Sequence, residues 1–547
     1  MAAKDTDSNV HDLEIYLNAH KDLPKAEVLK AIETKYSKRQ IYSRIATSLI
    51  SVNPYLPVEA YDENTYEKFD PWVYEDIPPR SHVFGTARDA YRNCVGFQRQ
   101  RHNCAIVAHG ISGSGKTENI RLVLRYILRA SSNVRKKKMS LANTNGIPLI
   151  YLASITSKFN FHMGDTRGIV HFDKVTTLYE YKPQRPADLH IKKGEMVQVL
   201  KKNPNGWWYG KNLRTNRLGL FPSNYVEVIA APPRSRGKEE PPATLEEKVM
   251  HAFCLLETFG NAKLMGNDNS TRDGCVFTLA VDRRGRLRHG AVTNFMVEQM
   301  RVTHQESHCY GFHVVYRVLA KVNAQGTNEE KKLFLSQPLN FLRKSTTDMR
   351  EAALLFLSPR SISLYCMIGF SSDDMKAIED VLKGILALGN IDFVNFVNAG
   401  TEISKESRPY LEFASRSLGI KEQILEALLT GTLSPAYGDN PGRMLCKSIA
   451  SEAFSLVFEY VLQTINESLG AGGSNGDISS VRYAVLVDLP GFEYLGEKNT
   501  IEQVSINFAS EALQSVYEEQ VRPSSPDEKD GGGGGGGGGG DDDRKLG

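Results

Sequence analysis

The sequence predicts an α/β fold built around a phosphate-binding loop and interrupted by a small all-β module. Residues 110–117 read G-I-S-G-S-G-K-T, a full match to G-x-x-x-x-G-K-[S/T]. The preceding residues 104–108 form a short apolar run typical of a buried strand, and apolar residues recur at helical spacing over residues 120–128. A self-contained module, called the β module from here on, is expected between about residues 174 and 229, and a proline- and charge-rich stretch follows it.

Strand, glycine-rich loop and helix in this order predict a phosphate cradle. Backbone N–H groups point into such a loop, and the N-terminus of the following helix adds positive dipole. Lys116 is placed to reach the β- and γ-phosphates of a nucleotide, and Thr117 to offer its hydroxyl to Mg²⁺. The expected ligands are therefore a nucleoside triphosphate and Mg²⁺. A chance Gly/Ser loop is disfavoured because both flanking elements are present. The residues assigned to the cradle are Gly110, Ser112, Gly113, Ser114, Gly115, Lys116, Thr117 and Glu118.

Composition indicates an ordinary globular protein. The 547 residues are 41% hydrophobic and 24% charged, with a net charge of only +3, which gives no argument for nucleic acid as a partner. The seven scattered cysteines contain no C-x-x-C pair, which disfavours a zinc site or a disulfide framework. Neither a signal region nor an apolar run long enough for a bilayer is present, so we expect a cytoplasmic location and no transmembrane segment.

The chain divides into five expected segments. These are an α/β part with the phosphate loop at 1–138, the β module at 174–229, a proline-rich linker at 230–243, a mostly helical part at 244–522 and a glycine-rich disordered tail at 523–547. Helices are expected at 245–259, 311–321, 374–388, 444–469 and 501–520, and strands at 275–281, 287–292 and 483–488. Residues 139–172 receive no assignment.

A second strand supplies the acid that a phosphate-loop enzyme needs. Residues 485–488 read V-L-V-D, and L-P-G-F-E follows. Asp488 is placed to hold the hydration shell of Mg²⁺, and the N–H of Gly491 to meet the γ-phosphate. An Asp at a strand end serves turn chemistry about as often, so this pattern alone is a weak signal.

A third segment makes the interpretation specific. Residues 259–272 read F-G-N-A-K-L-M-G-N-D-N-S-T-R, and with the two motifs above this resembles the myosin motor (head) family. Further blocks in the family's order are V-N-P-Y at 52–55, F-H-V-V-Y-R-V-L-A at 312–320, L-A-L-G-N-I-D-F at 386–393 and N-T-I-E-Q-V-S-I-N-F at 499–508. The resemblance covers about residues 10–130 and 243–520. It implies a P-loop NTPase fold with a mixed central sheet and many helices.

The resemblance also implies roles for individual residues. Asn53, Pro54 and Tyr61 would line the adenine pocket, while Lys116 and Asn267 would contact phosphates. Thr117, Thr271 and Asp488 would hold Mg²⁺. The catalytic set would be Ser270 beside the attacking water, Gly491 at the γ-phosphate, and Arg272 and Glu493 as the ion pair that closes the site. An incidental surface pair, worth little, is disfavoured for the last two by their motif positions.

Four positions depart from the family pattern. Ile111 stands where Glu is usual, Asp273 replaces Phe and Cys275 replaces a common Lys. In this resemblance residues 259–272 correspond to the family's first switch and residues 488–493 to its second switch. Pro490 lies inside the second switch, where it fixes φ and removes a donor. We expect these changes to affect the rate of hydrolysis more than nucleotide binding.

The β module resembles an SH3 domain over its whole length. The matching blocks are T-L-Y-E-Y at 177–181, K-K-G-E at 192–195, G-W-W-Y-G at 206–210 and G-L-F-P-S-N-Y-V at 219–226. An aromatic core would explain only Trp208 and Phe221. The others fit a shallow groove for proline-rich peptides, in which an acidic side chain meets a ligand Arg or Lys. The groove residues are Tyr179, Tyr181, Asp188, Trp207, Pro222 and Tyr225. The A-P-P-R of residues 231–234 is a conceivable internal ligand, although linker composition explains it better.

Two functions follow from these resemblances. The first is an actin-associated, cytoskeletal ATPase that carries a protein-binding module. The second is a non-motor nucleotide-dependent scaffold that recruits proline-rich partners. The resemblance ends just past Gln514, before the family's converter and lever, so we expect weak actin binding and no directed movement. A natural short form and a truncated gene product both remain open.

Overall fold

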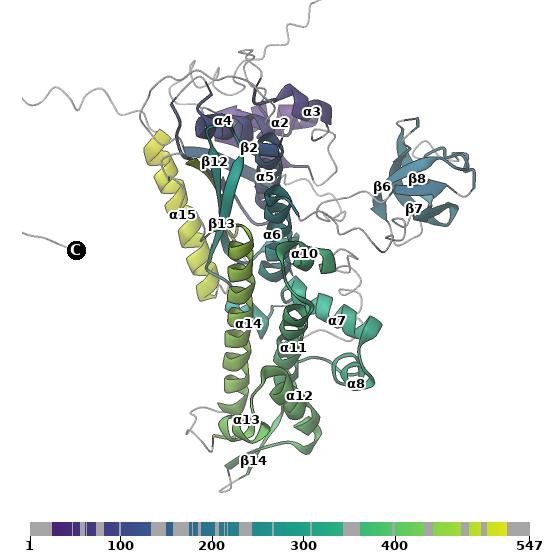
Figure 1. The fold of residues 1–547 in the computed structure, drawn as a ribbon, viewed down its shortest axis with the longest axis vertical. Helices are drawn as coiled ribbons and strands as arrows, with labels where there is room; N and C mark the ends of the chain where they lie inside the picture. The colour runs from purple at the N-terminus through teal and green to yellow at the C-terminus, as the bar shows by residue number, and fades with distance from the viewer. Residues whose placement is uncertain are drawn as a thin grey trace, which may run out of the picture.

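The computed structural model describes most of the chain. The described residues are 25–45, 48–54, 61, 63–72, 81–97, 100–132, 149–156, 174–177, 179–183, 188–202, 207–212, 214–215, 217–228, 243–264, 267–306, 309–342, 361–396, 400–431, 441–471, 481–493 and 500–521. The expected linker at 230–243 and tail at 523–547 lie almost wholly outside them. Most of the described residues pack around one large hydrophobic core, and the β module has a small core of its own (Figure 1).

A seven-stranded mixed sheet organises the main body. Its strand order is β1-β2-β4-β3-β16-β12-β13. The strands are β1 (Tyr42–Ile45), β2 (Ser48–Asn53), β4 (Leu149–Thr156), β3 (Cys104–His109), β16 (Val481–Asp488), β12 (Gly274–Asp282) and β13 (Leu287–Phe295). The four strands β2, β4, β3 and β16 run parallel. On one side β1 pairs antiparallel with β2, and on the other β12 pairs antiparallel with both β16 and the edge strand β13. This mixed sheet is consistent with the expected fold class.

The two motif-bearing strands lie side by side. β3 and β16 pair in parallel with Cys104 opposite Ala484 and Ala108 opposite Asp488. Most apolar residues of β3 are buried, whereas in β16 the buried Ala484 and Leu486 alternate with half-buried Val485 and Val487. Because parallel strands end at the same sheet edge, this register brings Asp488 next to the phosphate loop that follows β3.

One strand of the sheet has no counterpart in the sequence analysis. β4 lies between β2 and β3 and runs parallel to both. It falls in residues 139–172, for which no element was assigned. Its sequence, L-I-Y-L-A-S-I-T, is apolar enough for a buried strand. However, neither a recognisable motif nor an adjacent segment with helical or strand periodicity indicates its place in the fold.

The expected helices are present, and their ends follow local capping. The predicted helices at 245–259, 374–388, 444–469 and 501–520 correspond to α6, α11, α14 and α15. Capping boxes start α6 at Thr244 and α11 at Ser371. The predicted helix at 311–321 was wrong at both ends. Phe312 is extended and forms a β-bridge with Ala262, so that α7 begins at His313. The helix then continues past Lys321 to Gln325.

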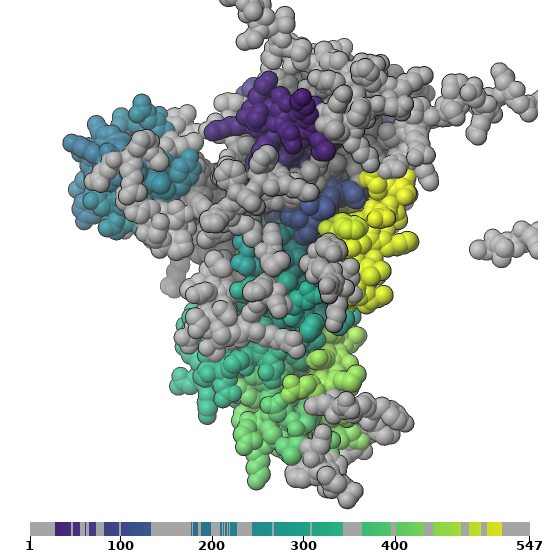
Figure 2. Space-filling view, turned by 180° about the vertical axis from the view of Figure 1, so that it is seen from behind, coloured from purple at the N-terminus to yellow at the C-terminus, as the bar shows by residue number. Residues whose placement is uncertain are grey.

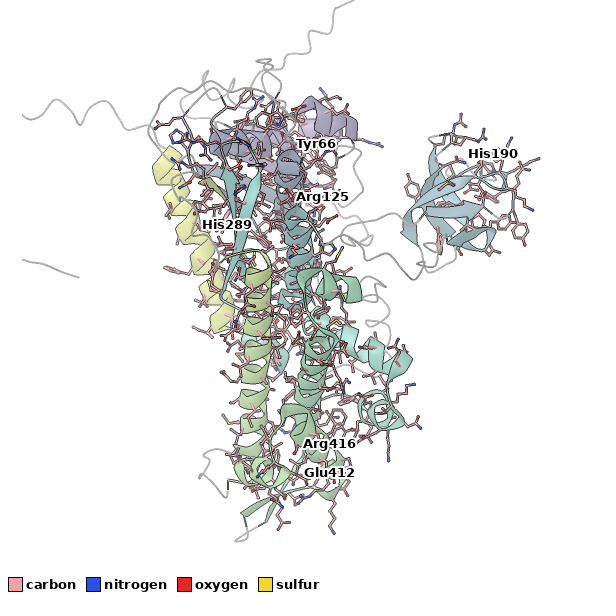
Figure 3. All side chains as sticks on the ribbon, viewed as in Figure 1. Tyr66, Arg125, His190, His289, Glu412 and Arg416 are labelled. Carbon is pink, nitrogen blue, oxygen red and sulfur yellow. The ribbon has the colours of Figure 1, made fainter. Side chains whose placement is uncertain are left out.

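Some helices pack against the sheet, as α4 and α5 do, and others, including α11, α12 and α13, extend the body away from it. The described helices are α2 (Lys25–Ser37), α3 (Glu63–Lys68), α4 (Val83–Val95), α5 (Lys116–Ser132), α6 (Leu245–Gly260), α7 (His313–Gln325), α8 (Asn328–Leu335), α10 (Ser361–Ile368), α11 (Ser372–Gly389), α12 (Arg408–Leu418), α13 (Glu422–Leu429), α14 (Pro441–Ser468) and α15 (Ile501–Val521). Figure 3 shows their side chains filling the space between α14 and α11, with Tyr66 at the sheet end and Glu412 at the opposite end. None of the described helices combines the length and apolarity needed to cross a bilayer.

Smaller elements complete the fold. The two hairpins of the main body are β10 (Asn261–Leu264) with β11 (Asn267–Thr271), and β14 (Phe393–Phe396) with β15 (Gly400–Ile403). The short 3₁₀ helices are η2 (Ser223–Tyr225), η3 (Gln299–Val302) and η4 (Lys405–Ser407). Seen from behind, α15 runs in yellow along one margin of the main body (Figure 2).

The predicted all-β module is confirmed as a five-stranded antiparallel sheet. Its order is β8-β7-β6-β5-β9. The strands are β5 (Lys174–Thr177), β6 (Met196–Lys202), β7 (Trp207–Asn212), β8 (Leu218–Pro222) and β9 (Val226–Val228). Tyr181, Leu189, Ile191, Val197 and Phe221 form its core.

Candidate nucleotide site

The loop between β3 and α5 has the backbone of a phosphate cradle. Gly110, Gly113 and Gly115 adopt φ values of 144°, 78° and 90°, which side-chain-bearing residues rarely adopt. The next residue, Lys116, opens α5, so the loop ends at a helix N-terminus. The phosphate-loop motif therefore lies in the strand–loop–helix context that the sequence predicted.

Lys116 is a buried cation at the centre of this loop. Its ammonium donates to the carbonyl of Ile111 at 2.9 Å. Burial lowers the pKa of Lys116 to about 8, although the nearby carboxylates of Asp488 and Glu493 act in the opposite direction. The Oγ of Ser114 is also buried and has no hydrogen-bond partner among the described residues. A buried ammonium beside an unsatisfied hydroxyl and a glycine nest suits an incoming phosphate group.

Three oxygen-bearing side chains meet at the start of α5. The hydroxyls of Thr117 and Thr271 lie 2.8 Å apart. Burial raises the pKa of Asp488 to about 6, a hydrogen bond from Thr117 acts against this shift, and the Oδ1 of Asp488 is buried without a partner among the described residues. Hydroxyl and carboxylate oxygens are ligands that Mg²⁺ prefers. Over the same described residues, no cluster of three or more His, Cys, Asp and Glu could hold a metal.

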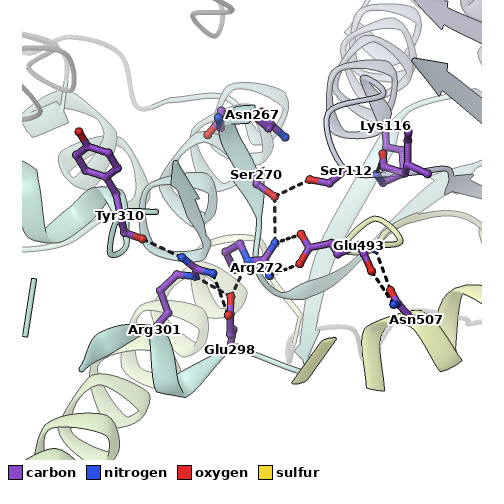
Figure 4. Close-up of polar contacts among 12 residues, drawn as sticks. Ser112, Lys116, Asn267, Ser270, Arg272, Glu298, Arg301, Tyr310, Glu493 and Asn507 are labelled. Atoms are coloured by element: carbon purple, nitrogen blue, oxygen red, sulfur yellow. Dashed lines mark hydrogen bonds and ion pairs between the residues drawn. The ribbon is translucent and has the colours of Figure 1, made fainter. Parts of the chain in front are cut away.

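The two switches are joined by a buried ion pair. Arg272 follows β11, Glu493 follows β16, and the guanidinium of Arg272 is completely buried (Figure 4). One amino group of Arg272 pairs with Oε1 of Glu493, and the other donates to Oε2 at 3.0 Å. The first amino group also donates to Ser270 Oγ at 3.2 Å, and Ser270 Oγ lies 3.2 Å from Ser112 Oγ in the phosphate loop. The structure thus brings together Ser270, Arg272 and Glu493.

The sequence analysis missed a second carboxylate on the same arginine. Glu298 accepts from the Nε of Arg272 at 2.6 Å, and from the Nε and Nη2 of Arg301 at 2.7 and 2.9 Å. Burial alone would raise the pKa of Glu298, but Arg272 and Arg301 hold it below its ordinary value. Arg301 is itself anchored on the carbonyl of Tyr310 at 2.9 Å. No motif marks Glu298, because 26 residues separate it from Arg272.

The second switch lies directly against the phosphate loop. A Cβ placed on Gly491 would collide with the Lys116 ammonium and with the backbone at Ser112. The amide of Ser112 donates to the carbonyl of Phe492 at 3.2 Å. On its other side the switch is tied to α15, because Asn507 accepts from the Glu493 amide at 2.9 Å and donates to the Glu493 carbonyl at 2.8 Å.

The residues assigned to the nucleotide's base and phosphates lie around this loop. The amide of Asn53 donates to the carbonyl of Gly113 at 2.8 Å, and Pro54 follows it at the end of β2. The hydroxyl of Tyr61 lies 2.7 Å from that of Tyr42, and burial raises the pKa of Tyr61 to about 12. Asn267 accepts from the amide of Asn269 at 3.0 Å within the first switch.

Comparison with known proteins decides the family. Residues 17–150 and 223–527 match the family model described as Myosin head (motor domain). The chain belongs to the myosin head family. Within this myosin head, residues 176–223 match the SH3 domain family. The two matches confirm both resemblances drawn from the sequence.

Relatives of the chain include myosins of several kinds. It is 24% identical over 90% of its length to the non-muscle myosin heavy chain of Drosophila melanogaster, and covers 21% of that protein. It is 23% identical over 92% of its length to unconventional myosin-Ic of Danio rerio, and covers 39% of that protein. It is 23% identical over 95% of its length to unconventional myosin-VI of Mus musculus, and covers 35% of that protein. The chain therefore spans about a fifth to two fifths of these relatives.

The unusual residues of this myosin head lie close to the switches. Asp273 is buried, accepts from the side-chain amide of Asn294 and occupies the space above Gly260. Burial, followed by repulsion from Asp488, raises the pKa of Asp273 to about 7. Cys275 lies opposite Asp488 in the pairing of β12 with β16, whereas Ile111 is about half exposed on the phosphate loop. A buried acid, Asp273, therefore directly follows Arg272 in the chain.

The SH3 groove residues are only partly exposed. Tyr179 is 60% exposed, and its ring centroid lies 5.8 Å from that of Tyr225. Tyr181 is buried in the small core, and its hydroxyl donates to Asp188 at 2.6 Å. Pro222 ends β8 just before η2, while the side chain of Trp207 lies outside the described residues. The assignment of Tyr181 to the groove was therefore wrong, because its ring is part of the core, whereas Tyr179, Tyr225 and Asp188 remain candidates for a groove.

Proposed function

We propose that this myosin head binds Mg·ATP in the phosphate cradle and hydrolyses it while the two switches are closed. The observation that carries the proposal is the buried pair of Arg272 and Glu493, which joins the switches over the loop that contains Lys116. Phosphoryl transfer depends almost entirely on positioning and electrostatics, so a site that encloses the reacting groups supplies most of what the reaction needs.

The side chains divide the work between binding and positioning. Lys116 and the loop amides would neutralise the phosphates, and Thr117, Thr271 and Asp488 would hold Mg²⁺. When bound, Mg²⁺ would offset the negative charge that develops on the phosphate oxygens. Ser270 is held by Arg272 on one side and Ser112 on the other, each at 3.2 Å, so its hydroxyl is well placed to orient the attacking water. Asn53, Pro54, Tyr61 and Asn267 would complete the binding of the nucleotide.

The pair also excludes bulk water. Arg272, Glu493 and Ser270 are all buried, so the reacting centre is dry when the switches are joined. Electrostatic interactions are stronger in such a site than in water. Asn507 joins the Glu493 backbone to α15, so a movement of Glu493 on closure of the switches would also move that helix.

Steady-state phosphate release with and without actin filaments is the test. We expect ATP turnover by the wild-type chain and its loss in Lys116→Ala and Glu493→Ala. Fluorescent-nucleotide binding separates the two steps, because Lys116→Ala should lose binding whereas Glu493→Ala should retain it. Turnover at the wild-type rate in Glu493→Ala would overturn the assignment.

A second function retains the nucleotide without turnover. Asp273 favours this second function. Its buried carboxyl directly follows Arg272 in the chain and, when ionised, would attract the same guanidinium that pairs with Glu493. The chain would then act as a nucleotide-dependent scaffold, with its SH3 domain recruiting proline-rich partners. Nucleotide binding without phosphate release, at any actin concentration, would select this alternative.

The remaining assignments follow from the two families. We propose actin filaments as a partner of the myosin head, proline-rich peptides as ligands of the SH3 domain, and a cytoplasmic, cytoskeleton-associated location. Co-sedimentation with actin filaments, with and without ATP, tests the first of these.

A further inference from the structure

The sheet has two ends with different chemistry. β12 begins at Gly274, beside the first switch, and ends at Asp282, while β16 runs from Val481 to Asp488 in the second switch. Their antiparallel register sets Cys275 opposite Asp488 and Asp282 opposite Val481. The turn between β12 and β13 therefore lies at the end of the sheet opposite the phosphate loop.

This turn carries a dense group of arginines. Residues 282–289 read D-R-R-G-R-L-R-H, with a single acidic residue among four arginines. Gly285 and Leu287 are buried, which leaves the arginines on the outer surface. We call the exposed side chains of Arg283, Arg284, Arg286 and Arg288 the arginine hairpin.

The positive charge of the arginine hairpin is poorly compensated. Arg286 and Arg288 share one carboxylate, Asp282, at 3.1 and 3.9 Å. Arg283 and Arg284 form no ion pair within the described residues. Over the whole chain the net charge is only +3, so this turn is a local concentration of charge.

Two further arginines, Arg101 and Arg482, lie next to the arginine hairpin at the same end of the sheet. Arg101 precedes β3 and donates to the carbonyls of Cys94 and Val281, each at 2.8 Å. Arg482, near the start of β16, donates to the Arg101 carbonyl at 3.3 Å. Burial, followed by repulsion from Arg482 and Arg283, lowers the pKa of Arg101. Like charges are thus held together at this end of the sheet.

Side-chain hydrogen bonds hold the hairpin backbone in place. The Oδ1 of Asp282 accepts from the amides of Arg284 and Arg286 at 2.8 and 3.0 Å. The buried hydroxyl of Tyr91 donates to the carbonyl of Gly285 at 2.6 Å, where φ is 81°. A turn held in this way presents its side chains without first ordering the backbone, which lowers the entropic cost of binding.

We propose that the arginine hairpin docks the protein on a membrane surface rich in anionic phospholipids. Guanidinium groups bind phosphate oxygens through paired hydrogen bonds, and four exposed arginines on one turn suit a surface of many headgroups. A single-stranded nucleic acid fits less well, because the only ring in residues 282–289 is His289, labelled in Figure 3, which packs towards Tyr483. The hairpin exposes no large apolar side chain, so the contact is electrostatic and stays at the headgroups.

The test is vesicle co-sedimentation of the full chain. Phosphatidylcholine vesicles with and without phosphatidylserine are compared for the wild type and for the double variant Arg283→Glu/Arg284→Glu, which leaves the pairing of Asp282 intact. Each basic residue near the surface strengthens binding about fivefold, so the double variant should bind anionic vesicles at least about twentyfold more weakly. The matched control is Lys332→Glu/Lys447→Glu, which makes the same charge change at exposed positions of α8 and α14 and should bind within about twofold of the wild type.

Several outcomes would overturn the proposal. They are equal binding by the double variant and the wild type, equal loss in the control, and binding to neutral vesicles as strong as to anionic ones. Retention on a short RNA or soluble inositol hexakisphosphate, without binding to vesicles, would assign the surface to another polyanion. Thermal melting of the variants checks that each is folded. ATP turnover is not part of the readout, so this proposal stands or fails independently of the proposed function.

Discussion

Arg272 is held between two carboxylates, Glu493 from the second switch and Glu298 from the segment after β13. Its two Nη atoms donate hydrogen bonds to Glu493, and its Nε donates to Glu298 at 2.6 Å, so all three nitrogens of the guanidinium are hydrogen-bonded. Glu298 is in turn neutralised by Arg301 at 2.7 Å. The switch pair is therefore part of a four-residue network in which Glu298 fixes the orientation of Arg272.

This network changes what a charge swap should do. Arg272→Glu and Glu493→Arg each place like charges face to face and should abolish phosphate release. The double swap restores attraction between the two positions, but the new Glu at 272 then meets Glu298. We expect its turnover to stay well below the wild-type rate, and the further change Glu298→Gln to raise it. Full recovery in the double swap, measured by phosphate release, would show that Glu298 has no influence on the pair.

The three oxygens at the start of α5 predict a magnesium-dependent loss of affinity. Thr271→Val removes one hydroxyl 2.8 Å from Thr117, with little change of shape. We expect about tenfold weaker nucleotide binding in the presence of Mg²⁺, equivalent to roughly 1.4 kcal/mol. Without Mg²⁺ the variant and the wild type should bind alike. Titration of a fluorescent nucleotide with and without a chelator is the measurement, and an equal loss in both conditions would argue against a metal role.

Gly491 should tolerate no side chain in the closed site. A Cβ at this position would collide with the Lys116 ammonium and the Ser112 amide, so Gly491→Ala should hold the second switch away from the loop. We expect retained nucleotide binding and a loss of turnover of at least about a hundredfold, as for other groups that act at the transition state. Gly290→Ala on β13 is the control, because its Cβ would meet nothing closer than 3.6 Å. Turnover that is equally reduced in both variants would indicate general destabilisation.

His313 should make the protein sensitive to acid. Burial, followed by repulsion from Arg317 and Lys263, lowers the pKa of His313 to about 3, below the ordinary value of 6.5. Between these values the unfolded chain binds more protons, so stability falls as the pH is lowered through 6.5. At pH 5 the loss is about 2 kcal/mol of unfolding free energy.

The measurement is denaturant unfolding of the wild type and His313→Gln at pH 7.5 and pH 5. The variant should lose less stability on acidification than the wild type does. His251→Gln, on the solvent side of α6, serves as the control and should lose as much as the wild type. The same acid loss in His313→Gln and the wild type would contradict the assignment.

The SH3 groove predicts weak binding of proline-rich peptides by the full chain. Tyr179 is 60% exposed and Trp207 is assigned to the groove by its motif, so Tyr179→Ala and Trp207→Ala should each weaken binding about tenfold or more. Lys193→Ala, in the exposed turn before β6, should leave binding unchanged. Fluorescence titration with a P-x-x-P peptide checks this. Unchanged affinity in both aromatic variants would place the ligand elsewhere.

Much of this protein could be predicted from its sequence, because its chemistry depends on short local motifs. The phosphate loop needs glycines and a lysine at fixed spacing, and buried strands and capped helices leave periodic or terminal signals. This is why β3, β16, α6 and α14 and the placement of Lys116 and Asp488 follow from residues close together in the chain. The SH3 domain was predictable for the same reason.

Other features were decided only by the tertiary structure. The position of β4 between β2 and β3 depends on parallel pairing with strands far away in the chain, and the sequence records no such pairing. Glu298 becomes part of the switch network only when η3 and its flanks fold against Arg272, which buries both charges and makes each the other's partner. Burial is also what moves the pKa values of Lys116 and Asp273, because desolvation depends on every neighbour that excludes water. Local residues specify the elements and the motifs, whereas the electrostatics of the site arise from the fold as a whole.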